Sequence, residues 1–138
     1  MITVKSVDFL MSIHHDLIAE VFALDAAQKG LINDYQSFSF AAFEGEELIG
    51  VVCGHTLFDE VHIADLAVKR EHQGKGVGLQ LVRMVEETFS GGKFTHVTLT
   101  TLGYQAPKFY EKLGYTLEFV RKHEKDSRLD KYFYRKLL

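Results

Sequence analysis

The sequence predicts an α/β chain of the α+β type, in which helices flank a mixed, mostly antiparallel central sheet of about six to seven strands. Two observations support this. Segments with strand and helix periodicity follow one another along the chain. Three consecutive strands precede a strand–helix–strand crossover, so a parallel pair is expected within an otherwise antiparallel sheet. With 138 residues, 46% of them hydrophobic, the chain is expected to form one domain over residues 1–138.

The first half of the chain predicts one helix and four strands. The helix has apolar residues at helical spacing and is expected to end before Gly30. The turn at residues 44–47 separates two strands that predict a β-hairpin. In order, the predicted elements are the strand Ile2–Val7, the helix Phe9–Gln28 and the strands Tyr35–Phe43, Leu48–Phe58 and Val61–Val68.

The second half predicts the crossover and a closing pair of strands. A helix follows residue 78 and is expected to end at Phe89, because Ser90, Gly91 and Gly92 come next. The remaining predicted elements are a strand at Thr95–Leu102, a short helix at Gln105–Leu113 and two final strands at Tyr115–Val120 and Tyr132–Leu137.

Composition excludes several classes of function. A net charge of −3 gives no basic field for nucleic acid. The single cysteine, Cys53, excludes an internal disulfide framework, and the seven histidines show no metal-ligand spacing, so no metal is expected. The chain starts without a long apolar signal region and has no run of roughly 20 apolar residues. A cytoplasmic protein with no membrane contact is therefore expected.

The glycine-rich stretch Gln73–Gly78 lies between a strand and a helix. Its alternating glycines allow the backbone to approach a ligand closely, and the first turn of the next helix offers unpaired N–H groups that suit a phosphate. The stretch fits neither the dinucleotide fingerprint nor the P-loop, because Leu79 stands where the first needs glycine and no lysine–serine or lysine–threonine pair ends it.

A second stretch, Gln105–Tyr115, contains an alanine, a Phe-Tyr pair and a Gly-Tyr pair and follows a predicted strand. Together, the two stretches resemble motifs A and B of the GNAT superfamily of acyl-CoA-dependent N-acyltransferases, in the same order and at similar spacing. Gln105 departs from the asparagine of many relatives but keeps a side-chain amide. The resemblance implies a GNAT-like sheet in which two central strands splay apart and acetyl-CoA lies in the opening.

Acetyl-CoA is the expected donor cosubstrate. Backbone N–H groups of Gln73, Gly74, Lys75, Gly76, Val77 and Gly78 are expected to bind its pyrophosphate at the positive end of the helix dipole. The Lys75 ammonium either adds a contact or is solvated. The unpaired edge of Leu66, Ala67 and Val68 is expected to bind the pantetheine amides through its backbone. Gln105 and Phe109 complete the predicted cofactor site through the resemblance.

The resemblance implies that Tyr110 is the general acid that protonates the departing thiolate, since tyrosine and thiol pKa values are close enough for proton transfer. The alternative is a tyrosine that only packs beside Phe109. His62 is the candidate base, because relatives often place a glutamate at the matching position of this strand. Glu60, Asp65 and water remain alternatives.

The resulting hypothesis is an N-acetyltransferase that transfers acetyl directly from acetyl-CoA to a primary amine of a small molecule or peptide. Asp59, Glu60 and Asp65 favour a cationic amine. The alternative is an acyl-CoA-binding sensor or interaction module without turnover. Exposed strand edges also allow a homodimer. The sequence leaves the acceptor, the acyl-chain preference and the oligomeric state open.

Overall fold

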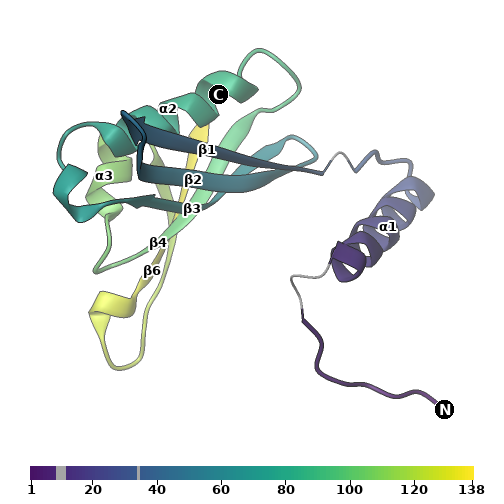
Figure 1. The fold of residues 1–138 in the computed structure, drawn as a ribbon. Coiled ribbons are helices and arrows are strands. Elements are labelled where there is room, and N and C mark those ends of the chain that lie inside the picture. The colour runs from purple at the N-terminus through teal and green to yellow at the C-terminus, as the bar shows by residue number, and fades with distance from the viewer. Residues whose placement is uncertain (9–11, 34) are drawn as a thin grey trace. The chain divides into compact units, whose positions relative to one another are not determined.

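The structure is a computed structural model that describes residues 1–8, 12–33 and 35–138 (Figure 1). The chain divides into two compact units, Met1–Tyr35 and Gln36–Leu138.

The first unit contains one helix, α1 (Ser12–Gln28). Gly30 follows it with φ of 73°, and the N–H of Leu31 donates to the carbonyl of Ala26, so the helix ends in a left-handed turn as predicted. The start predicted for this helix, residues 9–11, lies outside the described residues. The predicted strand Ile2–Val7 is wrong, because residues 1–8 have no regular structure. A strand needs a neighbour to pair its backbone groups, and the described part of this unit offers only a helix.

The second unit is built on a six-stranded sheet of order β1-β2-β3-β4-β6-β5. All pairs are antiparallel except β3 with β4, which confirms the predicted mixed sheet. The strands are β1 (Gln36–Glu44), β2 (Glu47–Leu57), β3 (Glu60–Val68), β4 (His96–Leu102), β5 (Thr116–Arg121) and β6 (Lys131–Leu137). The crossover from β3 to β4 carries α2 (Val77–Phe89), and α3 (Pro107–Lys112) connects β4 to β5. Two short 3₁₀ turns lie at Arg70–His72 and Ser127–Leu129.

The parallel pair is short. Its register runs from Glu60 opposite His96 to Ile63 opposite Leu99, and beyond this point the two strands diverge. Figure 1 shows β3 and β4 separating toward their C-terminal ends. The sheet therefore opens at its centre, as the resemblance implied.

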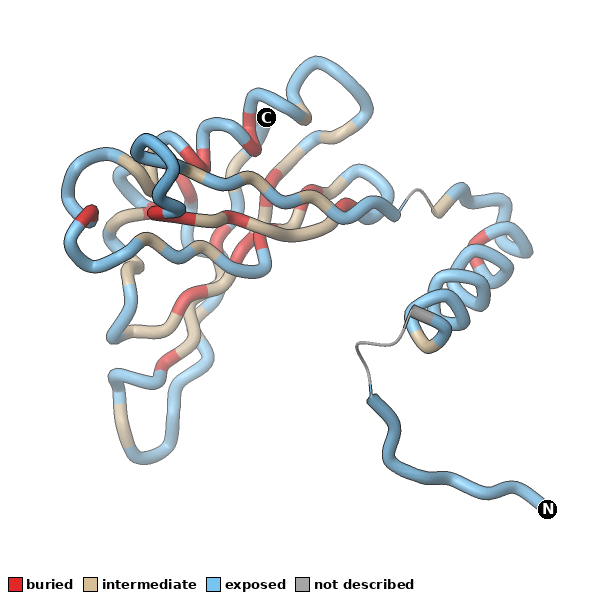
Figure 2. Tube along the Cα trace, viewed as in Figure 1, coloured by how far each residue is buried: buried red, intermediate tan, exposed pale blue. Residues whose placement is uncertain are grey.

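The core lies between the sheet and α2, which packs on β1, β2 and β3. Helix α2 forms because its apolar residues fall on one face, and Leu81, Val82 and Val85 are buried there. Buried positions gather along the inner strands and this helix (Figure 2). None of the helices in the described ranges is long and apolar enough to cross a membrane.

Candidate functional site

A cavity of about 980 Å³ lies where β3 and β4 diverge. Chain segments that are distant in sequence meet around it. It is lined by residues 63–68 of β3, by Arg70, Gln73, Gly74, Gly76, Gly78 and Leu79 of the loop and first turn of α2, by residues 99–102 and 104–106, by Phe109 and Tyr110 of α3, and by Lys131 of β6.

Most of the residues predicted to bind a cofactor line this one cavity. They are Leu66, Ala67, Val68, Gln73, Gly74, Gly76, Gly78, Gln105 and Phe109. Lys75 belongs to the same loop and Val77 begins α2, but neither lines the cavity. The two sequence stretches singled out above are thus adjacent in space, on opposite walls of the opening.

The glycine loop has the backbone that a bound phosphate requires. Gly74 and Gly76 have φ of 76° and 85°, in the left-handed region that favours glycine. A Cβ atom at either position would meet nothing within 4 Å, so both glycines face open space. Gly76 caps α2, whose first N–H groups have no acceptor within the helix. These donors and the positive end of the helix dipole form a site for an anion.

Gly78 has a different role from Gly74 and Gly76. A Cβ atom here would lie 3.2 Å from Cζ of Phe109. Because Gly78 has no side chain, the first turn of α2 can pack closely against Phe109 of α3. Gln73 also has a structural contact, because its side-chain amide donates to the carbonyl of Val68 at 2.9 Å and joins the loop to the end of β3.

The end of β3 offers backbone groups to the cavity. On one side Leu66, Ala67 and Val68 pair with β2. On the other side the register with β4 ends at Ile63, so this edge has no strand partner among the described residues. An extended ligand with amide groups can pair with such an edge as an added strand does.

Gln105 stabilises the end of β4 from the opposite wall. Its side-chain oxygen accepts a hydrogen bond from the N–H of Leu102 at 2.9 Å and one from the Thr101 hydroxyl at 3.4 Å. The amide that the sequence left available is therefore used to hold the strand end.

Tyr110 lines the cavity and is buried, with 7% of the residue exposed. Its ring contacts the rings of Phe109, Tyr115 and Tyr134, at centroid distances of 5.0, 5.9 and 6.3 Å. Burial raises the pKa of Tyr110 to about 12. The hydroxyl is therefore a weaker acid than the sequence alone suggests, and it keeps its proton over the whole physiological range.

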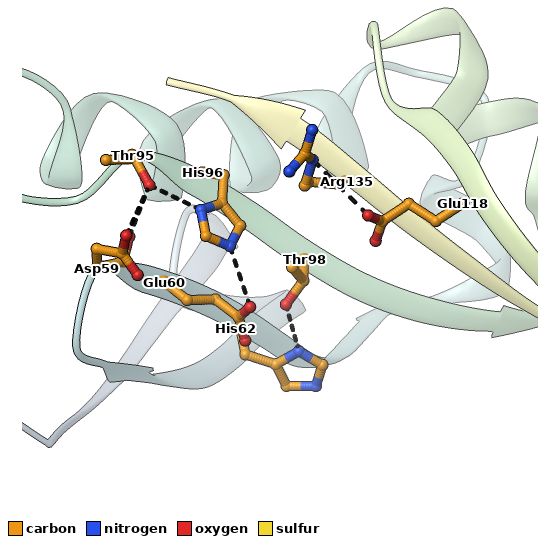
Figure 3. Close-up of polar contacts among 8 residues, drawn as sticks. All are labelled: Asp59, Glu60, His62, Thr95, His96, Thr98, Glu118 and Arg135. Atoms are coloured by element: carbon orange, nitrogen blue, oxygen red, sulfur yellow. Dashed lines mark hydrogen bonds and ion pairs between the residues drawn. The ribbon is translucent and has the colours of Figure 1, made fainter.

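His62 lies where β3 and β4 are still paired, and it does not line the cavity. Its Nδ1 atom forms a hydrogen bond of 2.8 Å with the Thr98 hydroxyl (Figure 3). Burial lowers the pKa of His62, and the nearby His55 and Lys131 lower it further against the opposing effect of Glu60. The imidazole is neutral near pH 7 and can accept a proton, but it needs a water to reach the cavity.

Asp65 is the acidic candidate that lines the cavity. The register between β2 and β3 shifts at Cys53 and Gly54, so Asp65 faces Cys53 while His62 faces His55. This bulge places Asp65 and His62 on the same face of the sheet. Burial and the Asp65 carboxylate raise the pKa of the Cys53 thiol, whose Sγ atom lies 3.8 Å from Oδ2.

Asp59 and Glu60 lie away from the cavity and have other partners. Oε1 of Glu60 lies 3.1 Å from Nε2 of His96, and Oδ2 of Asp59 accepts a hydrogen bond of 3.3 Å from the Thr95 hydroxyl (Figure 3). Of the three carboxylates expected to attract a cationic amine, only Asp65 is positioned to do so.

The predicted site left out five polar residues of the cavity wall, which are Arg70, Thr100, Thr101, Tyr104 and Lys131. Arg70 and Tyr104 each stand close to a recognised motif, and that proximity is the signal that could have found them. Lys131 enters the site only through the pairing of β6 with β4, which places it opposite Leu102. Within the described residues, no group of three or more metal-ligating side chains is found.

Comparison with known proteins agrees with this geometry. A model of the Acetyltransferase (GNAT) family matches residues 8–115. N-alpha-acetyltransferase 30 of Xenopus laevis is 34% identical over 109 residues, which make up 74% of this chain and 37% of that protein. The chain thus spans little more than a third of this relative's length.

Solved structures with this fold show the same arrangement of the sheet. A putative acetyltransferase from Agrobacterium tumefaciens superposes with a TM-score of 0.79 at 19% identity, over 100% of each chain. The PaiA N-acetyltransferase of Thermoplasma acidophilum, solved in complex with coenzyme A, gives a TM-score of 0.62 at 18% identity, over 91% of this chain and 71% of the other. Because the family match extends over most of the sequence and the fold agrees with it, the chain belongs to the GNAT family of acetyltransferases.

Proposed function

We propose that this chain is an acetyl-CoA-dependent N-acetyltransferase that transfers acetyl directly to a primary amine. The observation that carries the proposal is the cavity at the divergence of β3 and β4. It brings an anion-binding loop, an unpaired strand edge and a protonated tyrosine onto its walls.

The donor fits the wall formed by β3 and the glycine loop. The pyrophosphate of CoA accepts hydrogen bonds from the N–H groups around Gly74 and Gly76 and from the first turn of α2. The pantetheine amides pair with the backbone of Leu66–Val68. Gln105 and Phe109 complete the site by holding the opposite strand end and the first turn of α2 in place.

The reaction breaks the thioester C–S bond and forms an amide C–N bond. As the bond to sulfur breaks, the Tyr110 hydroxyl donates a hydrogen bond and then its proton to the leaving thiolate. Tyr110 regains a proton from solvent. Because burial keeps this hydroxyl protonated, it is in the donating state at every physiological pH.

The amine must lose one proton. Asp65, on the cavity wall, and His62, through a water molecule, are the two groups of the same sheet face that can accept it. Water alone is sufficient where the amine arrives already neutral. His62 remains the base favoured by the resemblance, and its lowered pKa keeps it able to accept a proton at neutral pH.

Two relatives support this direction. One of them carries the name N-alpha-acetyltransferase, and another was solved with coenzyme A. The predicted acceptor is an amine of a small molecule or a peptide. One domain over residues 1–138, a cytoplasmic location and a homodimer remain predictions.

The glycine loop gives a matched test of donor binding. Gly76 and Gly91 lie at the two ends of α2, both have positive φ, and a Cβ at either meets nothing within 4 Å. Alanine at either position should lower the free energy of unfolding by about 1 kcal/mol. Only Gly76→Ala should weaken CoA binding, by about tenfold or more, since its Cβ enters the phosphate site. Calorimetric titration with CoA measures both variants, and equal affinities would argue against the loop as the CoA site.

The function itself is tested by thiol release. Acetyl-CoA is mixed with a panel of amino acids, polyamines and short peptides, and free thiol is followed over time. Amine-stimulated release supports the proposal. CoA binding without stimulated release for any amine would instead support a sensor module, and a chain that binds no CoA would contradict both.

A further inference from the structure

Two cations face each other where β5 pairs with β6. Arg121 and Lys131 are direct cross-strand partners, so their side chains lie on the same face of the sheet. Both lie over the ring of Phe133, with the charged groups 5.4 and 5.6 Å from its centroid. Like charges directly opposite each other destabilise an antiparallel pair. The Phe133 ring offsets part of this repulsion through cation–π contacts. Full compensation requires a contact with an opposite charge.

Neighbouring cations of the same hairpin have such a contact. Four of them lie within 4 Å of a carboxylate, in the pairs Lys122–Asp130, Arg128–Asp126, Arg135–Glu118 and Lys136–Glu86. Among the described residues, neither Arg121 nor Lys131 has a carboxylate at that distance. Lys125, exposed in the loop, shares this property but does not line the cavity. Two adjacent cations without a counter-ion form a site that an anion would stabilise.

Lys131 places this site at the cavity. It lies opposite Leu102 and lines the cavity wall. Thr98 and Leu102 lie on the same face of β4, because they are an even number of residues apart. Their cross-strand partners His62 and Lys131 therefore lie on that face too. Helix α2 packs on the other face, over Val61 and Ile63. The cation therefore faces away from the helix whose N-terminus suits the pyrophosphate, and this favours the acceptor over the donor as its ligand.

The cavity has a charge of opposite sign across from Lys131. Asp65 lines the β3 wall and Lys131 the β6 wall, so an acidic and a basic residue belong to the two sides of the divergence. A molecule with both an amine and an anionic group is complementary to this pair of walls, with the amine toward Asp65.

We infer that the acceptor carries an anionic group, most simply a carboxylate, in addition to its amine, and that Lys131 binds this group with Arg121 beside it. The inference rests on the proposed acetyltransferase activity and names the class of its acceptor. Amino acids and peptides with an acidic group near the N-terminus belong to this class.

The test compares amines that carry a carboxylate with the matching amines that carry a neutral carboxamide. Thiol release is measured for α-amino acids against their carboxamides, and for dipeptides against their C-terminal amides. In each pair the wild-type protein should have the higher kcat/KM for the anionic member. Lys131→Met should lower that preference about tenfold. Lys125→Met makes the same charge change on the same hairpin and should leave the preference unchanged. The difference in amine basicity within a pair does not affect the comparison, because the kcat/KM ratio of the same pair is compared between the wild-type protein and each variant.

Two results would overturn the inference. One is an equal loss of kcat/KM for both members of a pair in Lys131→Met. The other is a loss of CoA affinity in that variant, which would assign the cation to the donor. A second measurement reads the anion site without turnover. N-acetylglycine is titrated into the CoA-bound protein and amide resonances are followed. Shifts at Arg121 and Lys131 that Lys131→Met abolishes support the site, and unshifted resonances contradict it. If no amine stimulated thiol release but the amide resonances of Arg121 and Lys131 still shifted, the result would contradict the proposed function and leave the anion site supported.

Discussion

Replacing Tyr110 with phenylalanine is expected to lower kcat about a hundredfold and to leave the Kd for CoA within about twofold. The substitution removes one hydroxyl and keeps the ring that contacts Tyr115 and Tyr134, so packing changes little. Catalysis loses the proton donor for the thiolate, whereas CoA binding depends on the glycine loop and the edge of β3. Stopped-flow thiol release and calorimetry separate the two quantities.

Tyr132→Phe is the matched control. Tyr132 lies on β6 near Tyr134 and does not line the cavity, so removal of its hydroxyl should leave kcat unchanged. A Tyr110→Phe protein that retains wild-type kcat would show that Tyr110 only packs. In that case the thiolate would leave without assistance from this residue.

The pH dependence gives an independent view of the same hydroxyl. Because burial raises its pKa to about 12, Tyr110 stays protonated as the pH rises from 6 to about 10. The wild-type kcat should therefore rise as the amine loses its proton and then remain level, without an alkaline fall below about pH 11. A fall near pH 9 in wild type that Tyr110→Phe abolishes would contradict the buried environment seen here.

Short-range patterns predicted much of this molecule correctly. The loop at Gln73–Gly78 and the stretch around Tyr110 are local motifs, and the backbone conformation of Gly74 and Gly76 follows from glycine itself. The six strands of the sheet also follow from local periodicity. The predicted strand Ile2–Val7 failed because alternation in sequence says nothing about whether a pairing partner exists.

What the sequence missed depends on long-range register. Counting along β3 cannot decide whether His62 and Asp65 share a face, because a bulge exchanges faces, and the shift at Cys53 and Gly54 brings both to one face. Lys131 becomes a cavity residue only through its pairing with Leu102. The low acidity of Tyr110 likewise comes from its burial among three other rings, which no local pattern records.

A largely buried charge cluster between α2 and β6 gives the largest expected effect on stability. Glu86 on α2 is 9% exposed and accepts a hydrogen bond of 2.9 Å from the Tyr115 hydroxyl. The Lys136 ammonium on β6 donates to both carboxylate oxygens of Glu86 at 3.2 Å and to the carbonyl of Leu113 at 2.8 Å. Burial and the Glu86 carboxylate both raise the pKa of Tyr115, so its hydroxyl remains a donor. The cluster joins α2, β6 and the C-terminal end of α3.

Lys136→Met should lower the free energy of unfolding by about 2 to 3 kcal/mol, because it leaves the largely buried Glu86 carboxylate without a counter-charge; the 26% exposure of the Lys136 side chain keeps the loss below that of a fully buried pair. Urea denaturation measures the change. The double variant Glu86→Gln with Lys136→Met should recover part of the loss, since a neutral amide is far less costly to bury. Arg135→Met is the control. Arg135 pairs with Glu118 at 3.8 Å with both side chains about half exposed, and its loss should cost less than about 1 kcal/mol.

The same cluster should influence catalysis in the protein that remains folded. Leu113 follows the last turn of α3, three residues after Tyr110, and the N–H of Tyr115 donates to the carbonyl of Tyr110 at 3.0 Å. Loss of the Lys136 contact therefore loosens the segment that positions the hydroxyl, and kcat should fall while CoA affinity is maintained. If Lys136→Met cost no more than Arg135→Met, the pair would be too well solvated to hold α3, and the position of Tyr110 would depend on ring packing alone.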